Sequence, residues 1–195
     1  LPCYERADLL GAIMSRYDCP IGVAGTHGKS TTTSMISCVL LRAGLDPTIS
    51  VGATLPQIHS NYHIGKKELF VFESCEYAGS FLKFFPKISV ILNIDEDHLD
   101  FYKDLDDIEA SFRRFAGLVP EDGWVVGWGD DPRVRRVLSS LKCRTRTYGL
   151  QPYNELRAED ISYDELGRPR FTVTLYGHPL CEVELAVSGE KNLLD

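Results

Sequence analysis

The sequence predicts an α/β protein, in which a mostly parallel sheet is flanked by helices and a small antiparallel β subdomain lies at the C-terminal end. Two observations predict this fold. Short continuous apolar runs alternate with helix-like segments up to about residue 150, which is typical of a parallel sheet covered on both faces. The pattern changes from about residue 155, and residues 170–187 alternate apolar and polar side chains with period two, as in antiparallel strands that expose one face.

The first elements surround a glycine-rich turn. Residues 5–17 carry apolar positions at helical spacing and predict a helix, and residues 19–25, CPIGVAG, predict a short buried strand. A second helix follows the turn and is expected to end at Gly44. Its expected apolar stripe consists of Met35, Ile36, Val39 and Leu40.

Further strands and helices then alternate along the chain. Apolar runs at residues 48–53, 68–74 and 87–94 predict buried strands, and residues 79–85, GSFLKFF, predict a short helix. Residues 104–119 predict a helix because acidic residues precede arginines, as the helix dipole favours. The alternating part is completed by a strand at 123–129, a helix at 130–141 and a strand at 143–150.

The C-terminal part follows a different pattern. Residues 170–187 alternate apolar and polar side chains around a Gly-His-Pro turn, which predicts a β-hairpin. We therefore expect an entry helix in residues 1–18 and one domain in residues 19–195. That domain would comprise a parallel core at 19–150, an antiparallel region at 151–188 and the start of a helix at 189–195.

Composition narrows the possible functions. At 195 residues and 44% hydrophobic, the chain can bury one substantial core. Its formal net charge of -7 offers no general attraction to polyanions, so we do not expect nucleic acid as a partner. No apolar stretch reaches the roughly 18 residues of a membrane span, so we expect no membrane association. Six scattered cysteines without metal-ligand spacing predict reduced, mostly buried thiols in a cytoplasmic protein.

The turn at residues 24–31, AGTHGKST, has the composition of a phosphate-binding loop. Backbone N–H groups at a helix N-terminus stabilise an anion, and glycines let the backbone approach it. Lys29 would bring a positive charge to the β and γ phosphates of a nucleotide, and Ser30 or Thr31 would offer a hydroxyl to Mg²⁺. The alternative is an ordinary glycine-rich turn with a surface lysine, but the strand before it and the helix after it favour the phosphate loop.

Two strand ends carry polar side chains that would face this loop. Glu73 ends one apolar run, Glu76 follows it, and NIDEDHLD follows the next run. Because open α/β sheets bind ligands at the carboxyl ends of their strands, these residues are candidate metal or substrate contacts. Mg²⁺ seldom takes imidazole, so residue chemistry alone makes His98 a general base or a neighbour of the metal ligands. A purely solvated role stays open for Asp95, Glu96 and Asp100.

The motifs AGTHGKSTTT, FESCEYAGSF and NIDEDHLDFY together resemble the central domain of the Mur ligases, the ATP-dependent amide-forming enzymes of peptidoglycan precursor synthesis. The resemblance covers nearly the whole chain. It implies that ATP is bound by Gly25, Thr26, His27, Gly28, Lys29, Ser30 and Thr31. It also implies catalytic roles for Lys29, Glu73 and His98. Ser30 and Glu73 would hold one Mg²⁺, and His98 would help to hold a second, against the general preference for oxygen ligands.

Two further details refine the resemblance. SGEKNLLD resembles the adenine-binding segment GxHNxxN of the family and implies that Asn192 contacts adenine, although Lys191 and Asp195 depart from the usual residues. Most members of the family have asparagine where this sequence has His27. A histidine there resembles the branch whose enzymes join UDP-N-acetylmuramate to L-alanine or, in recycling, to a tripeptide. L-Alanine is the expected substrate, with the tripeptide ligase and a non-catalytic nucleotide-binding module as alternatives.

The resemblance also implies a reaction and a domain layout. The substrate carboxylate would attack the γ phosphate to give an acyl phosphate, and an amine would then displace phosphate, without a nucleophilic side chain. The UDP moiety would bind an N-terminal domain and the amino acid a C-terminal domain, both outside these 195 residues. We expect the present stretch to fold, to bind ATP weakly and not to ligate alone.

Overall fold

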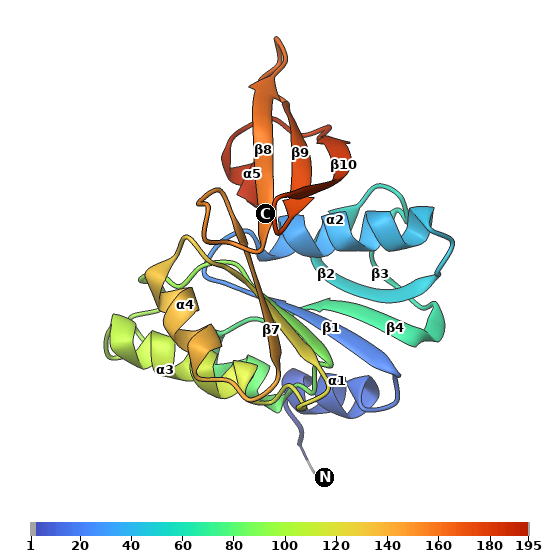
Figure 1. Ribbon diagram of the computed structural model, residues 1–195. Coiled ribbons are helices and arrows are strands. Elements are labelled where there is room, and N and C mark those ends of the chain that lie inside the picture. The colour runs from blue at the N-terminus through green and yellow to red at the C-terminus, as the bar shows by residue number, and fades with distance from the viewer. Residues whose placement is uncertain (1–2, 195) are drawn as a thin grey trace.

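The computed structural model describes residues 3–194, and the strands in this range form one ten-stranded sheet (Figure 1). Its strand order is β10-β9-β8-β7-β6-β5-β1-β4-β2-β3. The central strands from β2 to β8 pair in parallel, whereas β3, β9 and β10 are antiparallel to their neighbours. The predicted α/β fold with a mostly parallel sheet is therefore confirmed. The strands are β1 (Cys19–Ala24), β2 (Pro47–Leu55), β3 (Ser60–His63), β4 (Lys66–Glu73), β5 (Ile88–Ile91), β6 (Trp124–Trp128), β7 (Arg144–Gly149), β8 (Leu156–Tyr163), β9 (Pro169–Leu175) and β10 (His178–Glu184).

Helices cover both faces of the parallel strands. Figure 1 shows α2 on one side of the sheet and α1 and α3 on the other. The predicted helices at 5–17, 104–119 and 130–141 are confirmed with shorter bounds, and the short helix predicted at 79–85 is a 3₁₀ helix that begins two residues earlier. The helices are α1 (Arg6–Met14), α2 (Lys29–Arg42), the 3₁₀ helix η1 (Tyr77–Lys83), α3 (Leu105–Ala116), α4 (Pro132–Ser139) and α5 (Lys191–Leu194).

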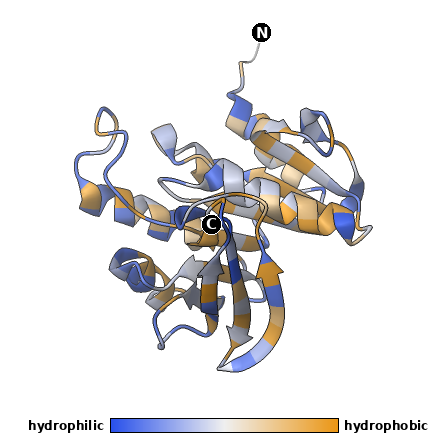
Figure 2. Ribbon diagram, turned by 90° about the horizontal axis from the view of Figure 1, so that it is seen from above, coloured by the Kyte–Doolittle hydropathy of each residue, from blue (hydrophilic) through white to orange (hydrophobic). Residues whose placement is uncertain are grey.

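The larger core lies between the sheet and the layer of α1, η1, α3 and α4. Phe81 of η1 stacks on Phe115 of α3 with 4.6 Å between ring centroids and meets Phe112 edge-on at 5.4 Å. All three side chains are fully buried. Such aromatic pairs stabilise a core beyond the apolar area they bury. Figure 2 shows hydrophilic and hydrophobic residues interleaved along the ribbon, and in α3 and α4 the buried positions gather on the face that meets the core.

The buried face of α2 consists of hydroxyl residues. Thr32, Thr33 and Ser37 are buried, whereas Val39 is 67% exposed. The hydroxyls of Thr32 and Ser37 donate to the carbonyl oxygens of Gly28 and Thr33 at 3.1 and 2.7 Å, which satisfies both against the sheet. The predicted apolar stripe does not form the fully buried face of α2, because Met35, Ile36 and Leu40 are half-buried and Val39 is exposed.

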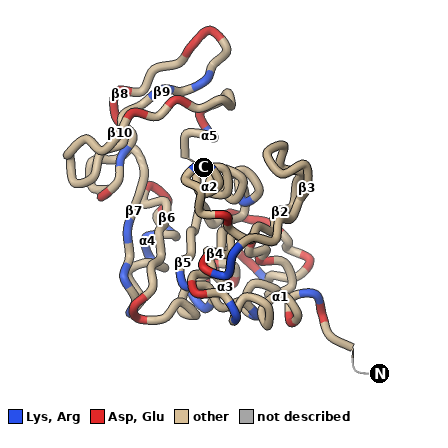
Figure 3. The backbone as a smooth tube through the Cα atoms, turned by 90° about the vertical axis from the view of Figure 1, so that its right-hand side faces the viewer, with Lys and Arg blue, Asp and Glu red and all other residues tan. Residues whose placement is uncertain are grey.

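The last three strands extend the sheet beyond β7. β8 joins β7 through two residue pairs, Tyr148–Leu156 and Gly149–Arg157, and then pairs with β9 along most of its length. The predicted hairpin is confirmed as β9 and β10. Figure 3 shows Lys and Arg interleaved with Asp and Glu along these strands and along the rest of the described chain.

Two smaller expectations concern the cysteines and membranes. Cys19, Cys38 and Cys143 are half-buried, and the other three cysteines are exposed, so the expectation of mostly buried thiols is wrong. Half-burial still disfavours the thiolate and raises the pKa of Cys19 above its ordinary value. Within residues 3–194, no helix combines the length and apolar character needed to cross a membrane.

Candidate active site

The glycine-rich loop connects the end of β1 to the start of α2. Gly25 has a φ of 155°, and a Cβ at this position would lie 2.8 Å from the Cβ of Leu92. Gly28 is the N-cap of α2 in the left-handed conformation, with a φ of 86°. Both positions therefore require glycine. The N-terminus of the 14-residue helix α2 opens directly onto the loop, as in an anion-binding turn.

A neighbouring loop holds this turn in place. The Asn93 side chain accepts a hydrogen bond from the backbone N–H of His27 at 2.8 Å and donates one to the carbonyl oxygen of His27 at 3.0 Å. The backbone N–H of Thr26 donates to the Asn93 carbonyl oxygen at 3.1 Å. The Thr26 hydroxyl accepts a hydrogen bond from the backbone N–H of Asp95 at 2.9 Å. The loop is thus fixed to the segment that follows β5.

Lys29 turns back over the loop. Its Nζ donates to the carbonyl oxygens of Gly25 and Thr26 at 2.6 and 3.2 Å and to Glu76 Oε1 at 3.1 Å. Glu76 Oε2 lies 3.0 Å from the same nitrogen but lacks hydrogen-bond geometry, so it makes an ion pair only. Lys29 is therefore bound to an acid that follows β4.

Glu76 also faces the loop after β5. Its Oε1 is 3.8 Å from His98 Nε2, and the ligand atoms of Glu76, Asp97 and His98 lie within 4.8 Å of one another. His98 has a φ of 52°, an unfavourable conformation for a residue with a Cβ and one that occurs at functional sites. Two carboxylates and an imidazole thus form a candidate divalent-metal cluster beside Lys29.

Glu73 and Ser30 lie outside that cluster, which within residues 3–194 consists of Glu76, Asp97 and His98. Glu73 Oε1 accepts a hydrogen bond from the backbone N–H of Gly52 in β2 at 2.6 Å. Ser30 and Thr31 are half-buried in the first turn of α2. The structure thus places Lys29, Glu76 and His98 together and directs Glu73 toward the adjacent strand. Metal binding by Ser30 and Glu73 stays a prediction.

A cavity of about 240 Å³ opens beside the loop. Its walls include His27, Gly28, Asn93, Trp128, Lys191 and Leu194. The indole N–H of Trp128 is buried without a hydrogen-bond partner. From α5, Lys191 and Leu194 line the cavity. The side chain of Asn192, which lies between them in the sequence, donates a hydrogen bond to the carbonyl oxygen of Ser188 at 2.7 Å. Adenine binding by Asn192 stays a prediction, and Asp195 lies outside the described residues.

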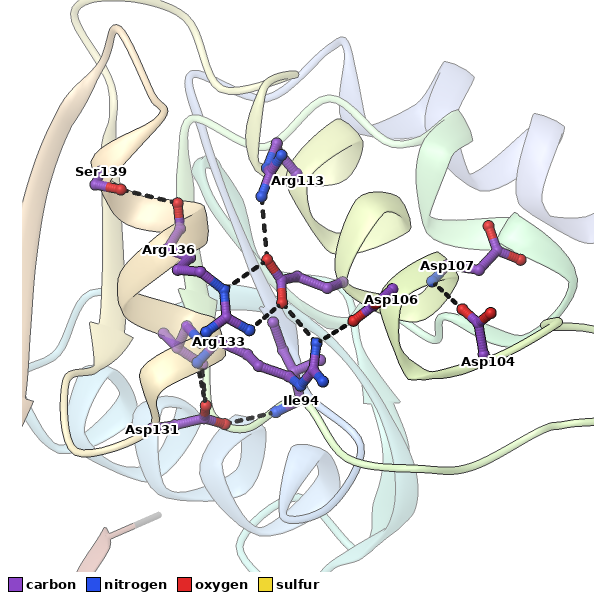
Figure 4. Close-up of polar contacts among 11 residues, drawn as sticks. Ile94, Asp104, Asp106, Asp107, Arg113, Asp131, Arg133, Arg136 and Ser139 are labelled. Carbon is purple, nitrogen blue, oxygen red and sulfur yellow. Dashed lines mark hydrogen bonds and ion pairs between the residues drawn. The ribbon is translucent and has the colours of Figure 1, made fainter.

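A charge cluster lies between α3 and α4, beside the segment that follows β5 (Figure 4). The buried carboxylate of Glu109 accepts hydrogen bonds from Arg113, Arg133 and Arg136. The Arg136 guanidinium, and after it Arg133, holds the pKa of Glu109 below its ordinary value. At the start of α4, Asp131 caps the helix and accepts a hydrogen bond from the backbone N–H of Ile94 at 3.0 Å. α4 is thereby fixed to the segment after β5.

Residues 23–194 match the family model described as the Mur ligase middle domain. The chain belongs to the Mur ligase family. The resemblance inferred from the three motifs is therefore confirmed. The family model covers the glycine-rich loop, both acidic strand ends and the C-terminal strands.

Two bacterial ligases are similar in sequence to this chain. The chain is 48% identical over 193 residues to the UDP-N-acetylmuramate–L-alanine ligase of Caldanaerobacter subterraneus subsp. tengcongensis, covering 99% of this chain and 42% of the relative. It is 47% identical over 191 residues to the enzyme of the same name from Clostridium botulinum, covering 98% of this chain and 42% of the relative. The chain thus spans less than half the length of these Mur ligases.

Solved Mur ligase structures share the fold. The UDP-N-acetylmuramate:L-alanyl-gamma-D-glutamyl-meso-diaminopimelate ligase of Neisseria meningitides superimposes with a TM-score of 0.86 at 25% identity, over 100% of this chain and 63% of that one. The UDP-N-acetylmuramate-alanine ligase of Thermotoga maritima gives 0.79 at 25% identity, over 94% and 40%. An L-alanine ligase and a tripeptide ligase are thus both structural neighbours of this chain.

Proposed function

We propose that this chain is the ATP-binding middle domain of a ligase that joins L-alanine to UDP-N-acetylmuramate in peptidoglycan precursor synthesis. The observation that carries the proposal is the placement of Lys29 between the glycine loop and the acidic cluster at the ends of β4 and β5. The identity of 48% to a ligase of that name supports the choice of substrates. The cytoplasm, where ATP is available, is the proposed location.

The geometry suits phosphoryl transfer followed by acyl transfer. An oxygen of the substrate carboxylate attacks the γ phosphorus, ADP leaves, and an acyl phosphate remains. The amine nitrogen of L-alanine then attacks the acyl carbon, phosphate leaves, and the nitrogen loses a proton. The first step needs positioning and charge neutralisation more than covalent chemistry. In this proposal the amides of residues 25–30 and the ammonium of Lys29 bind the phosphates, and the cavity beside Trp128 accepts the nucleoside.

The side chains around Lys29 also fit a divalent cation. Glu76 and Asp97 supply carboxylate oxygens, His98 supplies an imidazole nitrogen, and Glu76 Oε2 accepts no hydrogen bond. We propose that Ser30 and Glu73 hold one Mg²⁺ on the phosphate side and that His98, from this cluster, helps to hold a second. When bound, the cation would neutralise charge on the transferred phosphoryl group. Carboxylates suit Mg²⁺ best, and an imidazole is its least usual ligand here.

A second candidate function is ligation of a tripeptide. The Neisseria structure superimposes with a TM-score of 0.86 and is named for L-alanyl-gamma-D-glutamyl-meso-diaminopimelate. A non-catalytic nucleotide-binding module is the third candidate, and it would have no use for Glu73 and His98.

One assay separates these candidates. Full-length enzyme is supplied with ATP, Mg²⁺ and UDP-N-acetylmuramate, and phosphate release is measured with L-alanine and with the tripeptide. We expect release that depends on L-alanine. Release that depends only on the tripeptide would identify the recycling activity, and no release with either would favour the non-catalytic module. Glu73→Ala should abolish ligation while the circular dichroism spectrum is retained, since the proposed role of Glu73 is chemical.

A further inference from the structure

Glu76 is a buried acid that lies between Lys29, at the glycine-rich loop, and His98, in the loop after β5. Its side chain is 2% exposed. The Tyr102 hydroxyl donates a hydrogen bond to the Glu76 carbonyl oxygen at 2.5 Å, and the Gly79 backbone N–H donates to the same oxygen at 2.9 Å. These bonds fix the backbone and leave the carboxylate between Lys29 and His98.

Lys29 has no donor left for a phosphate in this arrangement. An ammonium carries three N–H donors, and Gly25, Thr26 and Glu76 provide three acceptors for them. Two of those acceptors are carbonyl oxygens of the loop itself. Lys29 can reach a phosphate only after it releases at least one of these partners, and Glu76 is the one that carries a full negative charge.

Releasing Lys29 alone would leave Glu76 as a buried charge without a counter-charge. Such a state is strongly unfavourable, because the interior solvates a carboxylate poorly. A replacement cation can enter from the side where Asp97 and His98 lie, with ligand atoms within 4.8 Å of those of Glu76. Glu76 Oε2 accepts no hydrogen bond, so its lone pairs are available to coordinate such a cation. The geometry therefore couples two events, cation entry and lysine release.

We propose that Glu76 is a positioning residue that exchanges the ammonium of Lys29 for a divalent cation, so that the cation frees Lys29 for the phosphates. This inference rests on the proposed function, because it assumes that Lys29 binds a nucleotide. It assigns a role to Glu76 that is separate from those proposed for Glu73 and Ser30. Cation and nucleotide must then bind with positive coupling through Glu76.

The coupling is measured by calorimetry on full-length protein with a non-hydrolysable ATP analogue, in EDTA and in Mn²⁺. In the parent protein, Mn²⁺ should strengthen analogue binding. In Glu76→Gln the pair with Lys29 is weakened, so we expect binding in EDTA to tighten about tenfold, while the gain from Mn²⁺ falls about tenfold. A purely structural role would weaken binding under both conditions. Glu121→Gln, which removes an exposed carboxylate in the loop before β6, is the control and should change neither value.

The outcomes separate the two proposals. If the parent protein binds no analogue under either condition, the proposed nucleotide function is wrong and the exchange has no basis. If the parent protein shows the Mn²⁺ gain and Glu76→Gln shows the same gain, the nucleotide function stands and the exchange is refuted. A crystal of the parent protein soaked in Mn²⁺ tests the exchange without a variant. We expect an anomalous peak on the Glu76 carboxylate and Lys29 Nζ beyond hydrogen-bond distance from it, whereas an unchanged Lys29–Glu76 pair would overturn the inference.

Discussion

Replacing Glu109 with glutamine tests how the charge cluster between α3 and α4 stabilises the fold. Glu109 is buried and accepts four hydrogen bonds, from Arg113 at 3.0 Å, from Arg133 at 2.8 Å and from Arg136 at 3.1 and 2.6 Å. Glutamine has nearly the same shape but carries no charge and offers one acceptor oxygen instead of two. Glu109→Gln therefore removes the shared counter-charge of three guanidinium groups and leaves the packing nearly unchanged.

The expected loss follows from the burial of the partners. Breaking a fully buried ion pair costs about 3–5 kcal/mol. Here Arg136 is 52% exposed and Arg133 is 23% exposed, so water can replace part of the lost interaction. We expect the free energy of unfolding to fall by about 2 kcal/mol, close to the worth of one charged hydrogen bond. For a chain of 195 residues, that corresponds to a midpoint lower by about 4–8 °C.

Urea unfolding followed by far-ultraviolet circular dichroism measures the change. Asp106→Asn is the matched control, because Asp106 contacts the same Arg133 at 2.8 Å but is 85% exposed. Its loss should be about 0.5 kcal/mol or less. If the two variants lose equal stability, burial of Glu109 does not set the strength of the cluster and the reasoning is refuted.

The same variant predicts a dependence on pH. Because Arg136 and Arg133 lower the pKa of Glu109 in the folded chain from its ordinary value of 4.5, the ionised form stabilises the fold. This contribution is fully present above pH 4.5 and is lost as the pH falls through the lower pKa of the folded state. The stability difference between the parent and Glu109→Gln should therefore be constant from neutral pH down to about pH 5 and shrink below that. A difference that grows on acidification would contradict the assignment.

Three further substitutions have definite expected outcomes. Gly25→Ala should destabilise the fold by about 1–3 kcal/mol and abolish binding of an ATP analogue in calorimetry, because the new Cβ would lie 2.8 Å from Leu92 and the φ of 155° disfavours alanine. Asp131→Ala should cost about 2–3 kcal/mol in urea unfolding, since the α4 cap is lost and the Ile94 N–H loses its partner. Phe81→Ala should cost about 3–5 kcal/mol by the same measurement, and a loss below about 1 kcal/mol would show that its stacking region collapses freely.

The parallel core and the glycine-rich loop could be predicted from the sequence, because both depend on local signals. Apolar runs mark strands buried on two faces, and GTHGKS between a strand and a helix needs its glycines for backbone reasons alone. The strand β3 was not predicted, and β8 lies in the antiparallel region expected at 151–188 but was not predicted as a strand of its own. β8, LRAEDISY, has no buried residue in the structure and so has neither a continuous apolar run nor a strict alternation. The buried face of α2 was mispredicted because hydroxyl side chains can be buried when the backbone satisfies them.

The candidate site was predicted in outline but not in its pairings. Lys29 and His98 lie close together as expected, since strand ends on one edge of a parallel sheet converge. Which of the two acids at the end of β4, Glu73 or Glu76, faces Lys29 depends on side-chain direction. The chain leaves β4 after Glu73, and the backbone before η1 directs Glu76 to Lys29. Trp128 was not predicted as a cavity residue, because nothing local separates it from an ordinary strand tryptophan.

The amide of Asn93 has a consequence for how a ligand would be captured. It pairs with both backbone groups of His27, as a neighbouring strand would. The entropy lost in ordering the glycine-rich loop is therefore lost when the polypeptide first folds, and little would remain to be lost when a ligand binds. A loop ordered in advance in this way would select a ligand by how well the ligand fits its fixed shape.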